Sequence, residues 1–349
     1  MVLLFLLFYI VALFFSAKYK IKNQHIFLFL SCILLAIFIG FRSSWPDQGA
    51  YIWAFVESPT VSNFSLSVKP VAYAEKGYFL LAGLIKTIYF NYTFYLLSMG
   101  LLSMLLLYVN LKKYAVIPLF GLCDYIARFI LNRDFTQMRS SLAILIIIYG
   151  LKYLNEKKII PYCLLVLIAY QFHHLALIAL PFYFLNMIKL NKYHLVVLLL
   201  FAFVASQTFA YSISDVVEQY SVDLQYEKYI EDDFKVENLG ILNPMIYFQL
   251  FVFILFICFE ESIKKITNYY ETLRNGYFYS TFILIFLCNY TALSGRTSTL
   301  FATYEIFIFP LLLKVQKDKR KILFSVFAGI LFMYFFYAKW NMHVIMNHS

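Results

Sequence analysis

Long apolar blocks separated by short polar stretches run through this sequence. Many of them approach the roughly 20 residues with which a helix crosses the hydrocarbon core of a bilayer. Of the 349 residues, 62% are hydrophobic and 14% are charged, which is too little polar surface for a soluble domain. Runs such as Leu142 to Tyr149 lack the alternation of a transmembrane β-strand. The sequence therefore predicts an all-α, polytopic integral membrane protein.

Several other classes are excluded on simple grounds. Met1 to Phe15 has no basic residue before it and no small-residue cleavage site before Lys18, which favours a retained helix over a signal peptide. The five cysteines lie in apolar blocks without CxxC spacing, so we expect no disulfide and no metal site. The net charge of +10 is spread over short loops, which argues against a nucleic-acid partner.

Clusters of basic residues predict the topology, because cytoplasmic loops are the ones enriched in Lys and Arg. Six connections carry such clusters: Lys18/Lys20/Lys22, Lys112/Lys113, Lys152/Lys157/Lys158, Lys189/Lys192, Lys264/Lys265/Arg274 and Lys314/Lys317/Lys319/Arg320/Lys321. Placing all six inside predicts about 12 transmembrane helices, with both termini outside, near 1–16, 26–41, 92–110, 115–131, 140–154, 159–172, 175–188, 194–213, 242–259, 276–293, 299–313 and 322–338.

The segment 76–90 does not fit this scheme, because a crossing there would move Lys112 and Lys113 to the wrong side. We expect it to be a re-entrant or interfacial helix on the outer face. That face then holds two long loops, 42–75 and 214–241, and tight connections at 132–139, 173–174 and 294–296. No repeat or low-complexity linker interrupts the chain, so residues 1–349 are expected to form a single membrane domain.

Arginines at the predicted outer ends are unusual, since positive residues favour the cytoplasmic side. A guanidinium matches phosphate oxygens, which makes Arg42, Arg133, Arg139 and Arg296 candidate anion ligands. Arg42 can equally be a cation that snorkels to the interface, and Arg133 can neutralise its neighbour Asp134. We expect a turn at Ser294–Arg296, followed by a helix whose positive dipole end faces outward.

The paired histidines His173 and His174 fit a general base or a phosphate donor, although they can also be helix caps. No third ligand lies nearby in sequence, so a metal ranks lower. Tyr51, with Trp45 and Trp53, either contacts substrate or belongs to an interfacial aromatic belt. The acidic loop 214–240, which includes Tyr220, is either an acceptor-sugar or lid loop or a solvated loop.

Several short motifs together resemble the EpsG-like branch of the Wzy-type polysaccharide polymerases. They extend from about residue 36 to about residue 310 and comprise Gly40-Phe-Arg42 with Asp47 and Tyr51, Glu75-Lys-Gly-Tyr78, Gln137-Met-Arg139, Ala169-Tyr-Gln-Phe-His173 and Arg296. Pro46 and the order Gln137-Met-Arg139 differ from the glycine and the Arg-Gln pair that are frequent in the branch.

The resemblance implies an enzyme of the bacterial inner membrane whose active site faces the periplasm. Its substrates would be undecaprenyl diphosphate-linked oligosaccharides, with the growing glycan transferred from its lipid diphosphate to the non-reducing end of a new unit. A repeat-unit flippase and a chain-length regulator would be its partners. The lipid diphosphate already activates the donor, so we expect no cofactor.

The candidate residues take roles within this implied reaction. The leaving diphosphate would be stabilised by Arg139 and Arg296, then Arg42 and Arg133. The acceptor hydroxyl needs a base, for which His173 ranks first, followed by His174, Asp47 and Glu75. The candidate sugar contacts are Tyr51, Tyr78 and Tyr220.

Three other functions remain open on the sequence. An O-antigen ligase would use the same donor and the same arginines. A sugar acyltransferase could use the histidine but would not need several outer arginines. A lipid-linked oligosaccharide flippase, which is a transporter, should carry charges through the depth of its bundle rather than at one face.

Overall fold

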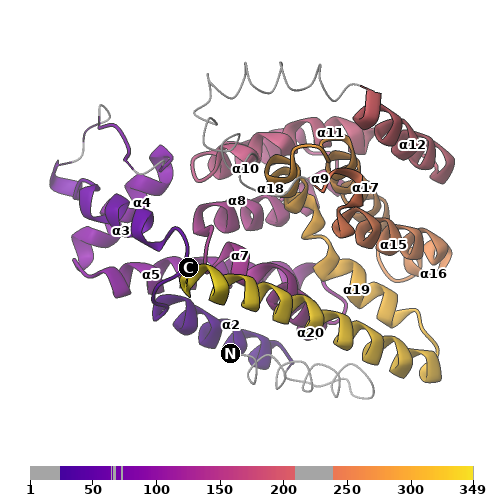
Figure 1. Ribbon diagram of the computed structural model, residues 1–349, viewed down its shortest axis with the longest axis horizontal. Helices are drawn as coiled ribbons and strands as arrows, with labels where there is room; N and C mark the ends of the chain where they lie inside the picture. Colours follow the sequence, from indigo (N-terminus) through magenta and orange to yellow (C-terminus); the bar gives the residue numbers. More distant parts are fainter. Residues whose placement is uncertain (1–23, 64, 66–67, 72–73, 209–238, 349) are drawn as a thin grey trace. The chain divides into compact units, whose positions relative to one another are not determined.

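Helices make up all the regular structure in the described part of the chain (Figure 1). The computed structural model describes residues 24–63, 65, 68–71, 74–208 and 239–348. Their contacts form two compact units, residues 1–180 with 306–349 and residues 181–305. The predicted all-α class is confirmed for these residues, whereas the predicted span at 1–16 and Tyr220 lie outside them.

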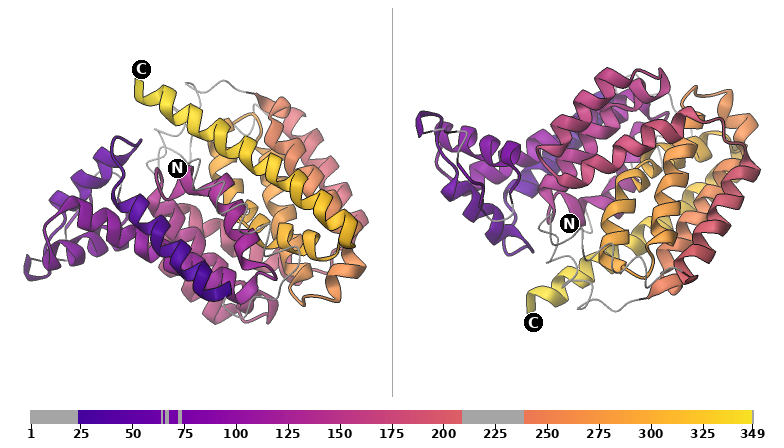
Figure 2. Two further views of the ribbon diagram at one scale, coloured as in Figure 1. Left: turned by 90° about the horizontal axis from the view of Figure 1, so that it is seen from below. Right: turned by 90° about the horizontal axis from the view of Figure 1, so that it is seen from above.

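The first unit contains most of the candidate residues. Its helices are α2 (Gln24–Gly40), α3 (Gln48–Glu57), η1 (Val61–Asn63), α4 (Lys76–Ile88), α5 (Tyr92–Tyr114), α6 (Pro118–Tyr125), η2 (Ile126–Ile130), α7 (Leu131–Arg133), α8 (Met138–Tyr149), α9 (Leu151–Asn155), α10 (Ile159–Tyr170), η3 (His174–Ile178) and α20 (Asp318–His348). Both views of Figure 2 place α3 and α4, in purple, at one end of this unit. The predicted outer loop 42–75 is thus partly helical.

The second unit is a smaller helical bundle. It contains α12 (Lys192–Thr208), η4 (Gly240–Leu242), α15 (Pro244–Cys258), α16 (Glu260–Lys264), α17 (Tyr270–Phe286) and α18 (Thr291–Ala302). The chain passes between the units in α11 (Ala179–Met187) and α19 (Glu305–Lys314).

Apolar helices with exposed faces mark this as a membrane protein. α5 and residues 319–342 of α20 are long and apolar enough to cross a bilayer, and shorter apolar helices occur at 24–40, 159–170, 174–187, 192–208 and 244–258. Large apolar side chains point outward on them, among them Leu30 at 58% exposure and Val197 at 63%. Such faces need lipid as their solvent, because water would leave this apolar area unburied.

The predicted 76–90 helix forms as α4, which is 13 residues long. At about 1.5 Å per residue it measures about 20 Å, shorter than the roughly 30 Å hydrocarbon core. The 12-residue α10, which is predicted to span, is shorter still, so the re-entrant or interfacial position of α4 stays a prediction.

One predicted connection is wrong. Ser294–Arg296 is not a turn but lies inside α18, and the chain instead breaks between α17 and α18 at 287–290. The small polar residues satisfy their hydroxyls within the helix: Thr297 Oγ1 donates to the Leu293 carbonyl at 2.7 Å and Ser294 Oγ to that of Thr291 at 3.2 Å. Such bonds to the preceding turn let Ser and Thr continue a helix. The preceding helix, α17, begins at Tyr270, six residues earlier than expected.

Close packing of α2 on α5 fixes where α2 ends. A Cβ added to Gly40 would lie 2.7 Å from the Leu97 Cα, and one added to Gly100 would lie 3.0 Å from a methyl of Ile39. Small residues allow two helix backbones to approach in this way. Arg42 follows two residues after Gly40, so this contact also sets its position.

Gly40→Ala is expected to lower the unfolding midpoint of the detergent-solubilised protein, because the methyl group must displace α5 backbone, at a cost of about 1–3 kcal/mol. The matched control is Gly49→Ala in α3, since a Cβ there meets no atom within 4 Å. A midpoint for Gly40→Ala no lower than that of Gly49→Ala would contradict the packing described.

Candidate active site

A buried arginine lies just beyond the end of α2. Arg42 is 6% exposed, and its Nη1 donates to the Ile39 carbonyl at 3.0 Å and its Nη2 to the Met138 sulfur at 3.0 Å. Its Nε has no hydrogen-bond partner, and no carboxylate pairs with it among the described residues. Burial lowers the pKa of this guanidinium, while three nearby tyrosines and the more distant carboxylate of Asp134 act in the opposite sense. Arginine nevertheless stays charged in proteins, so a positive charge is buried here.

A carboxylate lies between an arginine and a histidine close by. Glu75 is 6% exposed, and its Oε2 accepts a hydrogen bond from Arg139 Nη1 at 2.6 Å. Its Oε1 lies 3.4 Å from His174 Nδ1. Glu75 directly precedes α4, Arg139 lies in the first turn of α8 and His174 begins η3. The structure therefore brings together predicted residues that are up to a hundred positions apart.

Backbone contact between α4 and the end of α10 holds this arrangement. The Tyr78 N–H donates to the Gln171 carbonyl at 3.1 Å. A Cβ on Gly77 would lie 2.4 Å from the Gln171 Cβ, so only glycine allows this approach. Glu75, two residues before Gly77, is thereby held beside His174.

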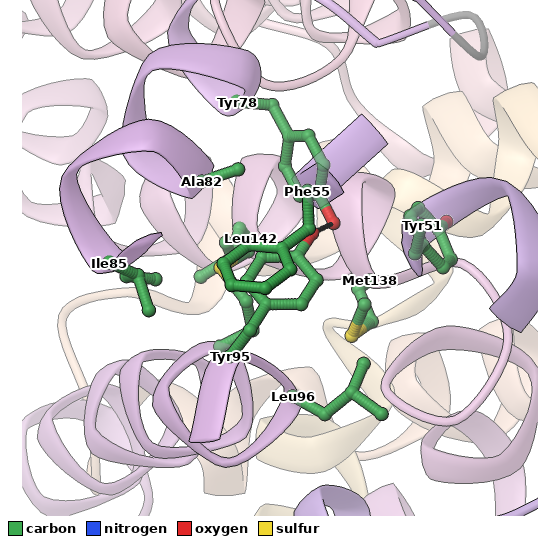
Figure 3. Packing of buried hydrophobic residues seen from close by; sticks show 10 residues of the cluster. Tyr51, Phe55, Tyr78, Ala82, Ile85, Tyr95, Leu96, Met138 and Leu142 are labelled. Atoms are coloured by element: carbon green, nitrogen blue, oxygen red, sulfur yellow. Dashed lines mark hydrogen bonds between the residues drawn. The ribbon is translucent and has the colours of Figure 1, made fainter. Parts of the chain in front are cut away.

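Buried aromatic rings pack together close to Arg139, and Figure 3 shows Tyr51, Phe55, Tyr78 and Tyr95 in this cluster. The Arg139 guanidinium lies 6.0 Å from the centroid of Tyr51, and the Tyr51 and Tyr78 rings are 5.8 Å apart. The Tyr78 and Tyr95 hydroxyls are hydrogen-bonded to each other, and Phe55 stacks on Tyr95 at 4.5 Å. Burial raises the pKa of Tyr51 to about 12, so this phenol is neutral at physiological pH.

The two adjacent histidines have different surroundings. His173 is buried, and its Nδ1 accepts the Leu175 N–H at 3.2 Å as the cap of η3. In the neutral ring this places the proton on Nε2. His174 is the more exposed ring; it faces Glu75 through Nδ1 and packs edge-on against Tyr170 at 5.1 Å. In the tautomer whose Nδ1 carries the proton toward this carboxylate, Nε2 is left as the acceptor.

A buried aspartate anchors the helix that carries Arg139. Asp134 is fully buried and accepts hydrogen bonds from the Tyr125 hydroxyl at 2.7 Å and from Ser141 Oγ at 2.6 Å. The sequence indicates Asp134 only as a neighbour of Arg133, because no spacing rule pairs it with Tyr125, nine positions earlier. These two hydrogen bonds, called the Asp134 clamp below, connect α6 to the first turn of α8.

The remaining candidate residues differ in burial and position. Asp47 is exposed at the start of α3, with a left-handed backbone (φ 61°) that aspartate tolerates. Arg133 is buried, with its guanidinium 4.2 Å from the Phe129 ring centroid. Tyr78 is fully buried, so its ring is packed in the core and is not an exposed surface for a sugar.

Arg296 belongs to the second unit. In the same unit, the buried Glu305 accepts a hydrogen bond from the Tyr277 hydroxyl at 2.8 Å.

No group of three or more His, Cys, Asp or Glu residues is placed to hold an ion within the described ranges. Arg42, Arg139, Glu75 and His174 instead combine positive charge with a carboxylate–histidine pair, which suits binding of an anion next to proton transfer.

Fold and site together define a helical membrane protein with a buried, arginine-rich polar cluster. The EpsG family model matches residues 25–349, and the chain belongs to this family of Wzy-like polymerases. No curated protein and no solved structure matches the chain. Family membership indicates a role of the polysaccharide-polymerase type.

Asp134→Asn is expected to destabilise the protein by about 1–3 kcal/mol, because an amide cannot accept from both hydroxyls without leaving one of its own donors buried. The measurement is the unfolding midpoint in detergent, with Asp47→Asn as the exposed control. Equal midpoints for the two variants would show that the Asp134 clamp contributes nothing.

Proposed function

We propose that the protein is a surface-polysaccharide polymerase, a glycosyltransferase of the bacterial inner membrane that acts at the periplasmic face. It transfers the growing glycan from undecaprenyl diphosphate to the non-reducing end of a new undecaprenyl diphosphate-linked repeat unit. Membership of the EpsG family supports the polymerase type, and the site supports a donor that carries an anionic leaving group.

The observation that carries the proposal is the buried Arg42. A buried guanidinium without a carboxylate partner costs several kcal/mol unless an anion compensates for its lost hydration. The Arg42 guanidinium donates to the thioether of Met138, which is a weak acceptor, and its Nε has no hydrogen-bond partner. A diphosphate would supply charge and oxygen acceptors together. Arg139 lies in the same cluster, because Arg42 bonds to Met138, the residue that precedes Arg139 in the first turn of α8.

Charge development explains why arginines would accelerate the transfer. As the bond between the anomeric carbon and the diphosphate oxygen breaks, negative charge grows on the leaving group. Arg42 and Arg139, held by the protein before the substrate arrives, stabilise that charge without reorganisation. Arg296, which the sequence predicts as a diphosphate ligand, belongs to the second unit, and its role stays a prediction.

The acceptor hydroxyl loses its proton in the same step, and His174 is the proposed base. Its Nε2 takes the proton as the acceptor oxygen attacks the anomeric carbon, while Glu75 holds Nδ1 and stabilises the imidazolium that forms. His173 was ranked first on the sequence. Its Nδ1 already accepts a backbone N–H, which suits a helix cap better than a base.

Arg42→Gln is expected to abolish polymer ladders when it complements a deletion strain, because the glutamine carries no charge for the diphosphate. Arg42→Lys should restore little, since an ammonium lacks the fork geometry of a guanidinium. Lys76→Gln, which removes an exposed cation beside Glu75, should keep the ladder. Protein levels are compared on immunoblots.

Full ladders with Arg42→Gln would refute this role of the arginine. The same gels separate the alternatives: loss of a polymerase leaves one repeat unit attached to the lipid acceptor, whereas loss of a ligase leaves it bare. A third pattern, with repeat units retained on the cytoplasmic side, would indicate a flippase.

His174→Ala is expected to reduce the rate of chain extension by about 10²–10⁴-fold, the usual contribution of a general base. His173→Asn should retain most of the activity, because asparagine can replace the histidine as a cap. Initial rates are measured with purified protein and lipid-linked repeat units. The opposite order of effects would assign the base to His173.

A further inference from the structure

Glu75 forms an ion pair with Arg139, one of the arginines proposed to bind the donor diphosphate. The Arg139 Nη1 to Glu75 Oε2 distance of 2.6 Å is short for a charge-assisted hydrogen bond, and the Arg139 and Glu75 side chains are only 15% and 5% exposed. Arginine presents the same fork of donors to carboxylates and to phosphates. A diphosphate that reaches this face of Arg139 therefore competes with Glu75.

The two oxygens of Glu75 have different partners. Oε2 faces Arg139, whereas Oε1 faces His174 at 3.4 Å, a longer and weaker contact. A carboxylate released by Arg139 would remain beside His174 and could interact with it alone. Its backbone would not need to move, because the contact between Tyr78 N–H and the Gln171 carbonyl holds the start of α4.

We propose that Glu75 is an anionic place-holder for one phosphate group of the donor, displaced from Arg139 when the lipid diphosphate binds. This inference rests on the proposed function, because it takes the donor to be a diphosphate. Donor binding then delivers a free carboxylate to His174 and prepares the base. His174 therefore interacts with Glu75 alone only when the donor is bound. When an acceptor binds without a donor, Glu75 is still paired with Arg139 as well as with His174.

Inorganic pyrophosphate is a suitable probe of this competition, since it carries the charge of the leaving group without lipid or sugar. Its dissociation constant is measured by calorimetry on the purified full-length protein in detergent. Glu75→Gln keeps the size of the side chain but removes the competing charge, and pyrophosphate should bind it about tenfold more tightly, which corresponds to about 1.4 kcal/mol. Chain extension by this variant should nevertheless fall.

Two further variants complete the design. Glu57→Gln removes an exposed carboxylate at the end of α3 and controls for net charge, so its pyrophosphate affinity should equal that of the wild type. Glu75→Gln combined with Arg139→Gln should lose the gain, since the place-holder acts through Arg139.

Equal or weaker pyrophosphate binding by Glu75→Gln would overturn the place-holder and identify Glu75 as a support that orients Arg139. The proposed function would survive that result if Arg42→Gln still weakened pyrophosphate binding. If the wild-type protein bound no pyrophosphate, and unlabelled lipid diphosphate did not inhibit chain extension, the proposed function itself would fail.

Discussion

Burial of the Arg42 charge is the constraint on which the site depends. A guanidinium removed from water loses its hydration, and its protein partners, a carbonyl and a thioether, compensate for it only in part. The close contact at Gly40 holds the end of α2 in this position. The protein thus maintains a buried cation that an anionic substrate can stabilise, which is the preorganisation expected of a site that meets developing negative charge.

Groups from distant parts of the chain complete the site by short, local devices. Gly77 allows α4 to meet the end of α10, so that Glu75 reaches His174. Asp134 ties the first turn of α8 to α6, and this turn presents both Met138 to Arg42 and Arg139 to Glu75. Gly77 acts through close backbone contact and Asp134 through hydrogen bonds between side chains, and together they explain how short motifs far apart in sequence can act as one cluster.

The sequence predicted the positions of several helices closely, but it did not predict the hydrogen bonds that the polar side chains form. Apolar blocks longer than ten residues have few structural solutions in lipid, so α2, α5, α10 and α12 lie close to their predicted positions. The prediction of a turn at Ser294–Arg296 was wrong, because serine and threonine hydroxyls can donate hydrogen bonds to carbonyls of the preceding helical turn. Composition does not reveal whether these residues form a turn or continue a helix.

The site was predictable as a set of residues but not as a set of contacts. Charges at the outer ends of apolar blocks identified Arg42, Glu75, Arg139 and His174. The pairing of Glu75 with both Arg139 and His174 spans 64 and 99 positions, and no local pattern encodes contacts of this separation. Tyr78 shows the converse, since its motif suggested a sugar contact whereas its hydroxyl is bonded to Tyr95 in the core.

The central claim is that the buried cation of Arg42 serves to release a lipid diphosphate during glycan extension. Its most direct test reconstitutes the protein in liposomes with undecaprenyl diphosphate-linked repeat units and follows both products by mass spectrometry. The account predicts one free lipid diphosphate for each repeat unit joined, and neither product with Arg42→Gln. Glycan extension by Arg42→Gln at the wild-type rate, or extension without release of lipid diphosphate, would contradict it.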